Sequence, residues 1–547
     1  MRSTRLSAAL LLPISLVVAL LVAVPVAGVL SNLGAGADSA QIFAHLWSTV
    51  LPEYLFNTVG IVSIALALSA VLGLGCAWLV AVFEFPGRRH FEWALVLPLA
   101  MPAYVVAYAY TDFLQFSGPV QSALRELFGW RARDYWFPEI RSIGGAGVLF
   151  ALVLYPYVYL LARTAFIERS ARLWDAARTL GHGPWSTFFR VSLPLARPAA
   201  VAGLALVMME TLADYGAVAY FGVPTLTAGI YKSWHAFSDR NAAAQIAAVL
   251  LLFVAVLMVI EQRGRGRARY YAASGRAVLH AKKRLGARHG WMASAFCALP
   301  LVFGFLLPLG ILLRLLWREE AFGASTRYLG WLFNTVLAAG FTSACAVLIC
   351  VLLAYAARVH ASLLQSLCNR IVSLGYAIPG AVIAVGILIP LARLDNWSAD
   401  LGWKLGLSGS LLALVYAYLV RFLAVAFQSV QTGLLKIRPS MDASARSLGH
   451  GWLSMLLRVH LPLLWRSVLS AALLVFVDVV KELPATLTVR PFNFDTLAVV
   501  TYQLAADERL AEAALPALTI VLIAFVPVLL LARAIASGRG AERSATD

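Results

Sequence analysis

The sequence predicts an all-α polytopic membrane protein, with twelve transmembrane helices arranged as two parallel six-span repeats. Of its 547 residues, 61% are hydrophobic and only 13% are charged, too few charges to cover a soluble protein of this size. Apolar runs of about 20 residues, the length that crosses a bilayer, recur along the whole chain. A polar segment between two such runs in the first half returns in the second half.

The apolar runs divide evenly between the two halves of the chain. The first run, from Leu6 to about Leu30, is too long for the core of a signal peptide and lacks a clear cleavage site, so we count it as a span. The expected spans are 8–30, 57–83, 93–114, 144–166, 197–217 and 243–261, followed by 292–316, 334–356, 371–392, 408–430, 466–484 and 512–533.

Basic residues gather in short segments on one side of these spans, which the positive-inside rule assigns to the cytoplasm. Both termini are therefore expected there. The segment 262–290 is rich in arginine and glycine and has no hydrophobic period, which predicts a flexible linker at anionic lipid, with a regulatory site as the alternative. It separates a first half, 1–261, from a second half, 291–547. Nucleic acid is not an expected partner, because no basic stretch alternates with stacking aromatic residues.

Shorter repeats support two related halves. The pentapeptide Leu55–Val59 recurs as Leu332–Val336, and Pro102 recurs as Pro379, both at an offset of 277 positions. Because each half has an even number of spans, the two halves have the same orientation in the membrane. Every feature that is repeated between them is therefore expected on the same side.

The repeated polar segment reads DAARTLGHGPWSTFFRVSLP over 175–194 and DASARSLGHGWLSMLLRVHLP over 442–462. A glycine such as Gly181 can end a helix in the left-handed conformation, and Pro184 suits the first turn of the next helix. Each copy therefore predicts a cytoplasmic helix–turn–helix with an exposed short helix. The alternative is an amphipathic helix in the lipid headgroup layer. The equal spacing of 13 residues from glycine to proline favours docking on a partner protein.

The first copy resembles the EAA loop of ATP-binding-cassette (ABC) importer permeases, whose pattern is Asp/Glu-Ala-Ala-x3-Gly-x9-hydrophobic-x-x-Pro. The matching positions are Asp175, Ala176, Ala177, Gly181, Val191 and Pro194. The second copy matches at Gly449 and Pro462, but Ala443 stands where the acid is expected and Asp442 lies one residue early. The role of the second acid is therefore open.

Within that superfamily, the fused twelve-span arrangement resembles the ferric-iron permeases, chiefly in the segments 209–225 and 481–498. The resemblance implies a permease subunit of an ATP-driven importer that works by alternating access in the bacterial inner membrane. Ferric iron is the expected substrate, with thiamine, phosphonate, sulfate or polyamine as alternatives. A proton- or sodium-coupled secondary transporter would also suit twelve spans with acids inside the membrane, but it would not explain two matched docking helices.

The resemblance also implies the partners of the chain. Two nucleotide-binding ATPase subunits are expected on the loops 168–194 and 436–462, and an extracytoplasmic substrate-binding protein at the outer loops 217–241 and 485–510, all around a chain embedded in the lipid bilayer. The chain itself is not expected to be an enzyme, because it has no GxxxxGK[ST] motif and no Gly-Lys pair. ATP and magnesium are expected in the ATPase, no cofactor is expected here, and no metal ligand is assigned.

Acidic residues recur at matching depths in the two halves. Glu210 lies 16 residues after Pro194, and Asp478 lies 16 residues after Pro462. A rise of ~1.5 Å per residue places them about 20 Å further along the helix, where an ionisable group must face a partner or a watery cavity. The candidate substrate pathway comprises Glu210, Asp214, Tyr215, Asp478, Lys481 and Glu482. Such oxygen donors suit a hard cation. The alternative is that the acids pair with Lys481, backbone N–H groups or hydroxyls and hold the protein together.

Overall fold

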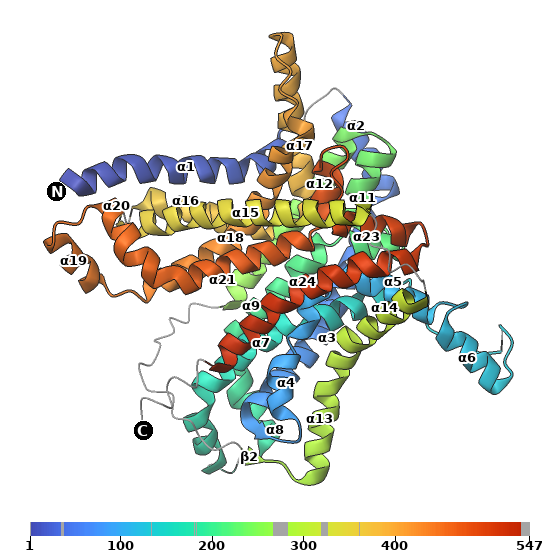
Figure 1. Ribbon diagram of the computed structural model, residues 1–547. Helices are drawn as coiled ribbons and strands as arrows, with labels where there is room; N and C mark the ends of the chain where they lie inside the picture. Colours follow the sequence, from blue (N-terminus) through green and yellow to red (C-terminus); the bar gives the residue numbers. More distant parts are fainter. Residues whose placement is uncertain are drawn as a thin grey trace. The chain divides into compact units, whose positions relative to one another are not determined.

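The computed structural model describes residues 2–33, 38–132, 134–179, 181, 183–265, 283–318, 326–359 and 362–537 (Figure 1). These residues are almost entirely helical, and the only strand pairing among them joins β1 (Phe83–Glu84) to β2 (Lys283–Arg284) in parallel. In this part of the chain, eleven helices are long and apolar enough to cross a membrane, and one bent pair can supply a twelfth span. The predicted all-α polytopic fold is confirmed.

The chain forms two compact units, and neither is a contiguous half of the sequence. Unit 1 comprises 1–51, 229–251 and 323–500, and unit 2 comprises 52–228, 252–322 and 501–547. Each unit therefore contains the middle of one half together with terminal segments of the other. The sequence repeat and the compact units divide the chain differently.

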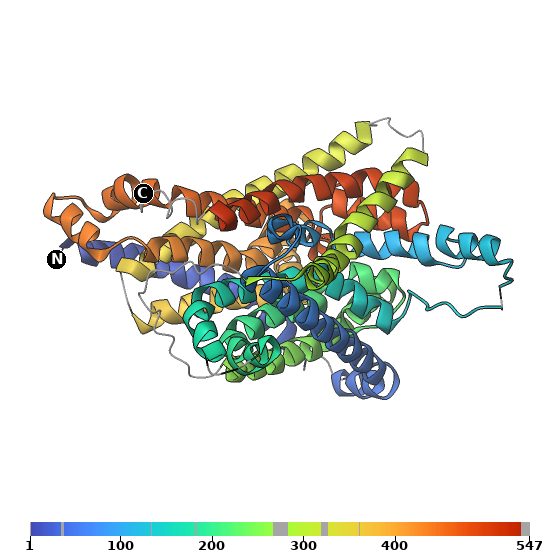
Figure 2. The same ribbon diagram turned by 90° about the horizontal axis from the view of Figure 1, so that it is seen from below.

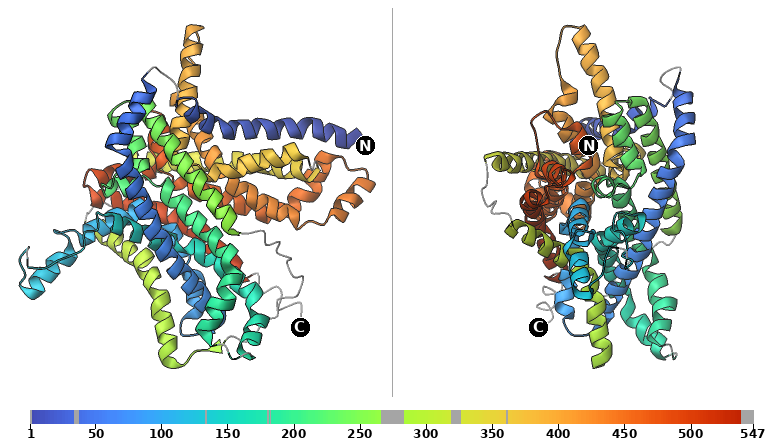
Figure 3. Two further views of the ribbon diagram at one scale, coloured as in Figure 1. Left: turned by 180° about the vertical axis from the view of Figure 1, so that it is seen from behind. Right: turned by 90° about the vertical axis from the view of Figure 1, so that its right-hand side faces the viewer.

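Unit 1 contains α1 (Arg2–Leu30), α2 (Ser39–Thr49), α15 (Thr326–Val359), α16 (Leu363–Leu374), α17 (Gly380–Asp400), α18 (Leu411–Leu435), α19 (Pro439–Ser447), α20 (Trp452–Met455), α21 (Leu461–Val480) and α22 (Pro484–Val489). Helix α1, which opens the first half, packs on α15, α16 and α17 of the second half. Figure 3 shows α17 running across α1. This crossing is close, because a Cβ added at Gly386 would lie 2.1 Å from the carbonyl oxygen of Pro25.

Unit 2 contains α3 (Leu51–Val82, beyond its first residue), α4 (Arg88–Ala94), α5 (Ala103–Leu114), α6 (Pro119–Phe128), α7 (Ile143–Thr179), α8 (Pro184–Thr187), α9 (Leu193–Ala213), α10 (Gly216–Tyr220), α13 (Ala287–Leu301), α14 (Leu307–Arg318) and α24 (Leu510–Ser537). Helices α14 and α24 of the second half pack on each other and on α5 of the first. Figure 2 shows α6 extending away from the other helices of its unit. Helices α11 (Leu226–Tyr231), α12 (Arg240–Arg265) and α23 (Leu497–Ala506) begin in one unit and end in the other.

The third apolar run of each half contains a break that hydropathy does not reveal. In the first half, the helices Arg88–Ala100 and Ala103–Phe128 meet at 91°. In the second half, α16 ends at Leu374 and α17 begins at Gly380. Pro102 and Pro379 precede the helix that resumes, and the residue before each proline is extended, as proline sterics require. The repeated proline therefore marks a break between helices in both halves, and in the first half the break is a sharp turn.

The expected linker is only partly described. Residues 266–282 lie outside the described residues. At its ends, α12 continues to Arg265 and α13 begins at Ala287, so helix extends into the segment expected to be flexible.

Candidate coupling loops and membrane acids

The second polar loop has the expected helix–turn–helix form. Helix α19 begins at Pro439, after the extended Arg438, and ends before Gly449, which has a φ of +80°. This left-handed conformation is one that glycine adopts without a Cβ penalty. Helix α20 then begins at Trp452 and leads through the π-helical turn Leu456–His460 into α21. Leu448, beside Gly449 in the turn between α19 and α20, is 78% exposed.

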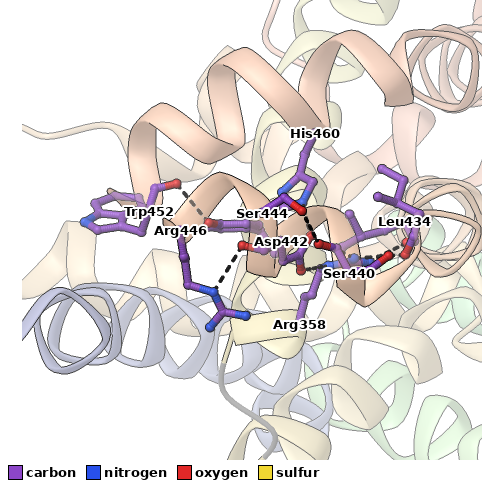
Figure 4. Close-up of polar contacts among 10 residues, drawn as sticks. Arg358, Leu434, Ser440, Asp442, Ser444, Arg446, Trp452 and His460 are labelled. Atoms are coloured by element: carbon purple, nitrogen blue, oxygen red, sulfur yellow. Dashed lines mark hydrogen bonds and ion pairs between the residues drawn. The ribbon is translucent and has the colours of Figure 1, made fainter. Parts of the chain in front are cut away.

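Asp442, the acid of this loop, is held from inside the chain (Figure 4). The residue is only 8% exposed. Arg358 at the end of α15 donates from Nε to Oδ2 at 2.7 Å and from Nη2 to Oδ1 at 3.1 Å, and Nε2 of His460 lies 2.9 Å from Oδ1. Burial alone would raise the pKa of the Asp442 carboxyl, but the contacts with Arg358 and His460 outweigh it and hold that pKa below its ordinary value. Asp442 is therefore ionised at neutral pH.

The first loop has the same outline. Gly181 has a φ of +82°, Pro184 starts α8, and the π-helical turn Phe188–Ser192 leads into α9, which includes Pro194. Asp175, Ala176 and Ala177 lie near the end of α7, but their side chains fall outside the described part of the structure, as do Leu180 and His182.

Aromatic packing seats the short helix of the first loop. Trp78 of α3 lies against Trp185 and Phe188, with ring centroids 5.6 Å and 4.8 Å apart. Trp185 remains 68% exposed on its other side, and Phe189 is also exposed. The first loop therefore presents an apolar surface, as the second loop does.

Two of the candidate pathway acids cap short helices. Asp214 follows α9, and its Oδ1 accepts from the backbone N–H of Ala217 at 2.8 Å. Glu482 follows α21 at the equivalent position, and Oε1 accepts from the N–H of Ala485 at 2.9 Å, also three residues ahead. Both acids thus satisfy the first turn of the helix that follows, α10 or α22.

Glu482 has further partners besides this backbone N–H group. It is buried, its Oε2 accepts from both the N–H and the hydroxyl of Thr486 at 3.0 Å and 2.6 Å, and Oε1 lies 3.3 Å from Nη1 of Arg421. A Cβ at Gly380 would lie 2.6 Å from the same Arg421 nitrogen, so glycine leaves room for this ion pair. These contacts favour a structural role for Glu482.

The other candidate acids lie within α9 and α21. Glu210 is half-buried near the end of α9, and Asp478 is half-buried near the end of α21. Asp478 pairs with Lys481 at 3.0 Å. Tyr215 receives a hydrogen bond from the hydroxyl of Tyr502 at 3.5 Å. Among the described residues, no group of three histidine, cysteine or carboxylate side chains could hold a metal ion.

Repeated asparagine and threonine side chains tie each half together, a role that the repeated pentapeptide did not reveal by itself. The Asn57 amide donates to the carbonyl of Pro224 at 2.8 Å, and the Thr58 hydroxyl accepts from the first N–H of α11 at 3.2 Å. The equivalent Asn334 donates to the carbonyl of Asp495 at 3.1 Å, and Thr335 accepts from the first N–H of α23 at 2.8 Å. The same two side chains therefore close the same turn in both units.

Part of the sequence matches a known protein family. Residues 69–263 match the family of binding-protein-dependent transport system inner membrane components. This segment of the chain belongs to that family of transport permeases. The predicted resemblance to ABC importer permeases is confirmed, and the chain is a multi-pass inner-membrane protein.

The relatives of the permease carry several substrate names. A Fe(3+)-transport system permease of Haemophilus influenzae is 24% identical over 487 residues, which cover 88% of this chain and 90% of that protein. A molybdenum transport system permease of Escherichia coli is 27% identical over 206 residues, 37% of this chain and 87% of that protein. A bacterial alginate ABC transporter solved with its periplasmic protein aligns at 15% identity and a TM-score of 0.36, over 46% of this chain and 96% of that chain.

The network around Glu482 generates a stability prediction. Replacing Glu482→Gln removes the charge that Arg421 needs in a buried site, and we expect the free energy of unfolding to fall by about 3 kcal/mol. Glu512→Gln is the matched control, because Glu512 pairs with Arg509 at an exposed site, where about 0.5 kcal/mol is expected. Thermal unfolding of the purified permease in detergent measures both. Equal shifts in the two variants would show that the buried network does not stabilise the fold.

Proposed function

We propose that the permease is the membrane subunit of an ATP-driven importer and that its two polar loops dock on separate ATPase subunits. The observation that carries this proposal is the pair of helix–turn–helix loops, one in each unit, with a left-handed glycine at the same position. Each loop leaves large apolar side chains exposed beside that glycine, including Trp185 and Leu448. Exposed apolar groups of this kind are typical of protein interfaces. The basic segments support a cytoplasmic location for both loops and both termini, on the side where ATP is available.

Ferric iron is the substrate that we propose. In support, the relative named for Fe(3+) transport aligns along 88% of the chain, whereas the molybdenum permease aligns along only 37%. The chemistry of the candidate pathway points the same way, because carboxylates favour a hard cation over an oxyanion such as molybdate or sulfate. Thiamine, phosphonate, sulfate and polyamine remain alternative substrates of the same importer class.

We further propose that Glu210 and Asp478 provide the acidic lining along which the cation passes. They occupy equivalent positions in the two halves and are half-buried, as a group that meets a watery path would be. Asp214 and Glu482 act beside them as helix caps, and Lys481 offsets the charge of Asp478. The lining guides a passing ion and does not trap it, which suits a transporter that must release its substrate.

Reconstitution tests the proposed function directly. The permease, its ATPase and its substrate-binding protein would be placed in proteoliposomes, and uptake of ferric iron measured. We expect uptake to require ATP and the binding protein, because the docking loops have no role without an ATPase. Uptake driven by a proton gradient alone, without ATP, would identify an ion-coupled secondary transporter instead.

The acidic lining gives a second test. We expect Glu210→Gln to lower the rate of iron uptake about tenfold, the effect of losing about 1.4 kcal/mol of charge stabilisation along the path. Asp478→Asn should act similarly. Assembly with the ATPase should be unchanged in both variants, and Glu512→Gln serves as the control for loss of an exposed acid. Uptake at the unmodified rate in both variants would remove the acidic lining from the account.

A further inference from the structure

The acid of the second loop faces the interior of its own unit. Asp442 is buried, and both its oxygens are occupied by Arg358 and His460. A side chain in this position cannot serve as a surface contact for another protein. Asp442 lies one residue before Ala443, the position at which the loop pattern expects the acid, and this shift explains why its side chain is buried. Successive side chains of a helix point about 100° apart around its axis, so Asp442 and Ala443 lie on different faces of α19. The face with Asp442 is the buried one.

Asp442 connects the loop to three membrane-spanning helices at once. Arg358 belongs to the end of α15, and it also donates to the carbonyls of Leu434 at 2.6 Å and Ile437 at 2.9 Å, beside the end of α18. His460 is fully buried and immediately precedes α21. The cytoplasmic ends of α15, α18 and α21 therefore meet at one carboxylate of α19, as Figure 4 shows for the side chains.

A further contact joins the two short helices of the loop to the same place. The hydroxyl of Tyr355, one turn before Arg358 on α15, donates to the carbonyl of Trp452 at the start of α20 at 2.8 Å. The Tyr355 ring also lies against the His460 ring, with centroids 5.4 Å apart. Both α19 and α20 are thus fixed to α15.

The first half cannot build this clamp. At the positions equivalent to Arg358, Asp442 and His460 the sequence has Ala81, Trp174 and Ser192. The position equivalent to Tyr355 is Trp78, which seats the first loop through aromatic packing. The two loops therefore have different side chains at the positions that form the clamp.

We propose that Asp442 is a positioning residue that transmits displacement of the second loop to α15, α18 and α21. The Asp442–Arg358–His460 clamp makes the loop and these helices move as one body. Charge and directed hydrogen bonds fix the second loop, whereas aromatic packing contributes to the attachment of the first. The proposal rests on the proposed docking of an ATPase on this loop.

The test compares ATPase binding with transport in the reconstituted complex. Asp442→Asn keeps the size of the side chain but removes the charge that holds Arg358. We expect this variant to copurify with the ATPase at the level of the unmodified permease, while the iron transported per ATP hydrolysed falls about fivefold or more, as for a typical coupling between sites. Asp442→Glu, which retains the charge, should restore part of the coupling.

Three further variants make the outcome unambiguous. Gly449→Glu is the reference for blocked docking, because it adds a charged side chain to the exposed turn. Glu512→Gln changes an exposed acid outside both loops and should leave transport per ATP unchanged. Arg358→Lys keeps the charge but loses the paired geometry, and it replaces Asp442→Asn if that variant is not monodisperse.

The possible results separate the clamp from the function on which it rests. Loss of ATPase copurification in Asp442→Asn, as in Gly449→Glu, would make Asp442 a docking contact and overturn the proposal. Unchanged transport per ATP in Asp442→Asn would also overturn it. Failure of the unmodified permease to bind any ATPase would refute the proposed function itself.

Discussion

The absence of hydrogen-bonding partners in the hydrocarbon layer is the constraint on which this fold depends. A chain can interrupt its helices at membrane depth only where other groups satisfy the freed backbone. The permease interrupts them after α9 and after α21, and in both places an acid caps the next helix. Thr58 and Thr335 then satisfy the first N–H of α11 and α23. The two halves therefore repeat the side chains that accept hydrogen bonds from free backbone N–H groups, as well as the apolar spans.

This constraint separates two kinds of acid that look alike in the sequence. Asp214 and Glu482 are committed to backbone N–H groups, and Glu482 also to Arg421. Glu210 and Asp478 lie one helical turn earlier, within α9 and α21, and are half-buried. The hydrogen bonds and ion pairs of an acid within a membrane span therefore have to be identified before the acid is assigned a role in transport.

At equivalent positions of the repeat, the two units have different polar contacts. In unit 2, Glu92 of α4 pairs with Arg88 and with the buried Arg163 of α7. The equivalent of Arg88 and Glu92 in unit 1 is a neutral pair, in which the Gln365 amide donates to Asn369 at 3.0 Å. Unit 1 has buried ionic contacts elsewhere, around Asp442 at its loop and between Glu482 and Arg421. At this pair of equivalent positions, one half therefore has an ion pair and the other has a neutral hydrogen bond.

Much of this arrangement follows from the sequence, and the rest has physical reasons for being hidden. Hydropathy locates the spans because each must be apolar over its length, and the glycine of each loop is predicted because only its conformation fits the turn. The breaks at Pro102 and Pro379 are missed because the residues around them remain apolar. The repeat shows that the halves are related, but it cannot show that α1 packs on α15 to α17, since apolar faces are interchangeable in sequence.

The role of Asp442 is hidden for a different reason. The motif gives a sequence position for an acid, but in a helix a shift of one residue moves a side chain to another face. Only the partners Arg358 and His460, which lie 84 and 18 residues away, reveal that the face is an internal one. Long-range contacts of this kind have no local signal.

If both loops dock on ATPase subunits, one permease chain binds two of them. The mass of the purified complex, measured by native mass spectrometry, gives this stoichiometry. We expect two ATPase subunits for each permease chain, one for the loop at Gly181 and one for the loop at Gly449. A complex with a single ATPase subunit per chain, or with none, would contradict it.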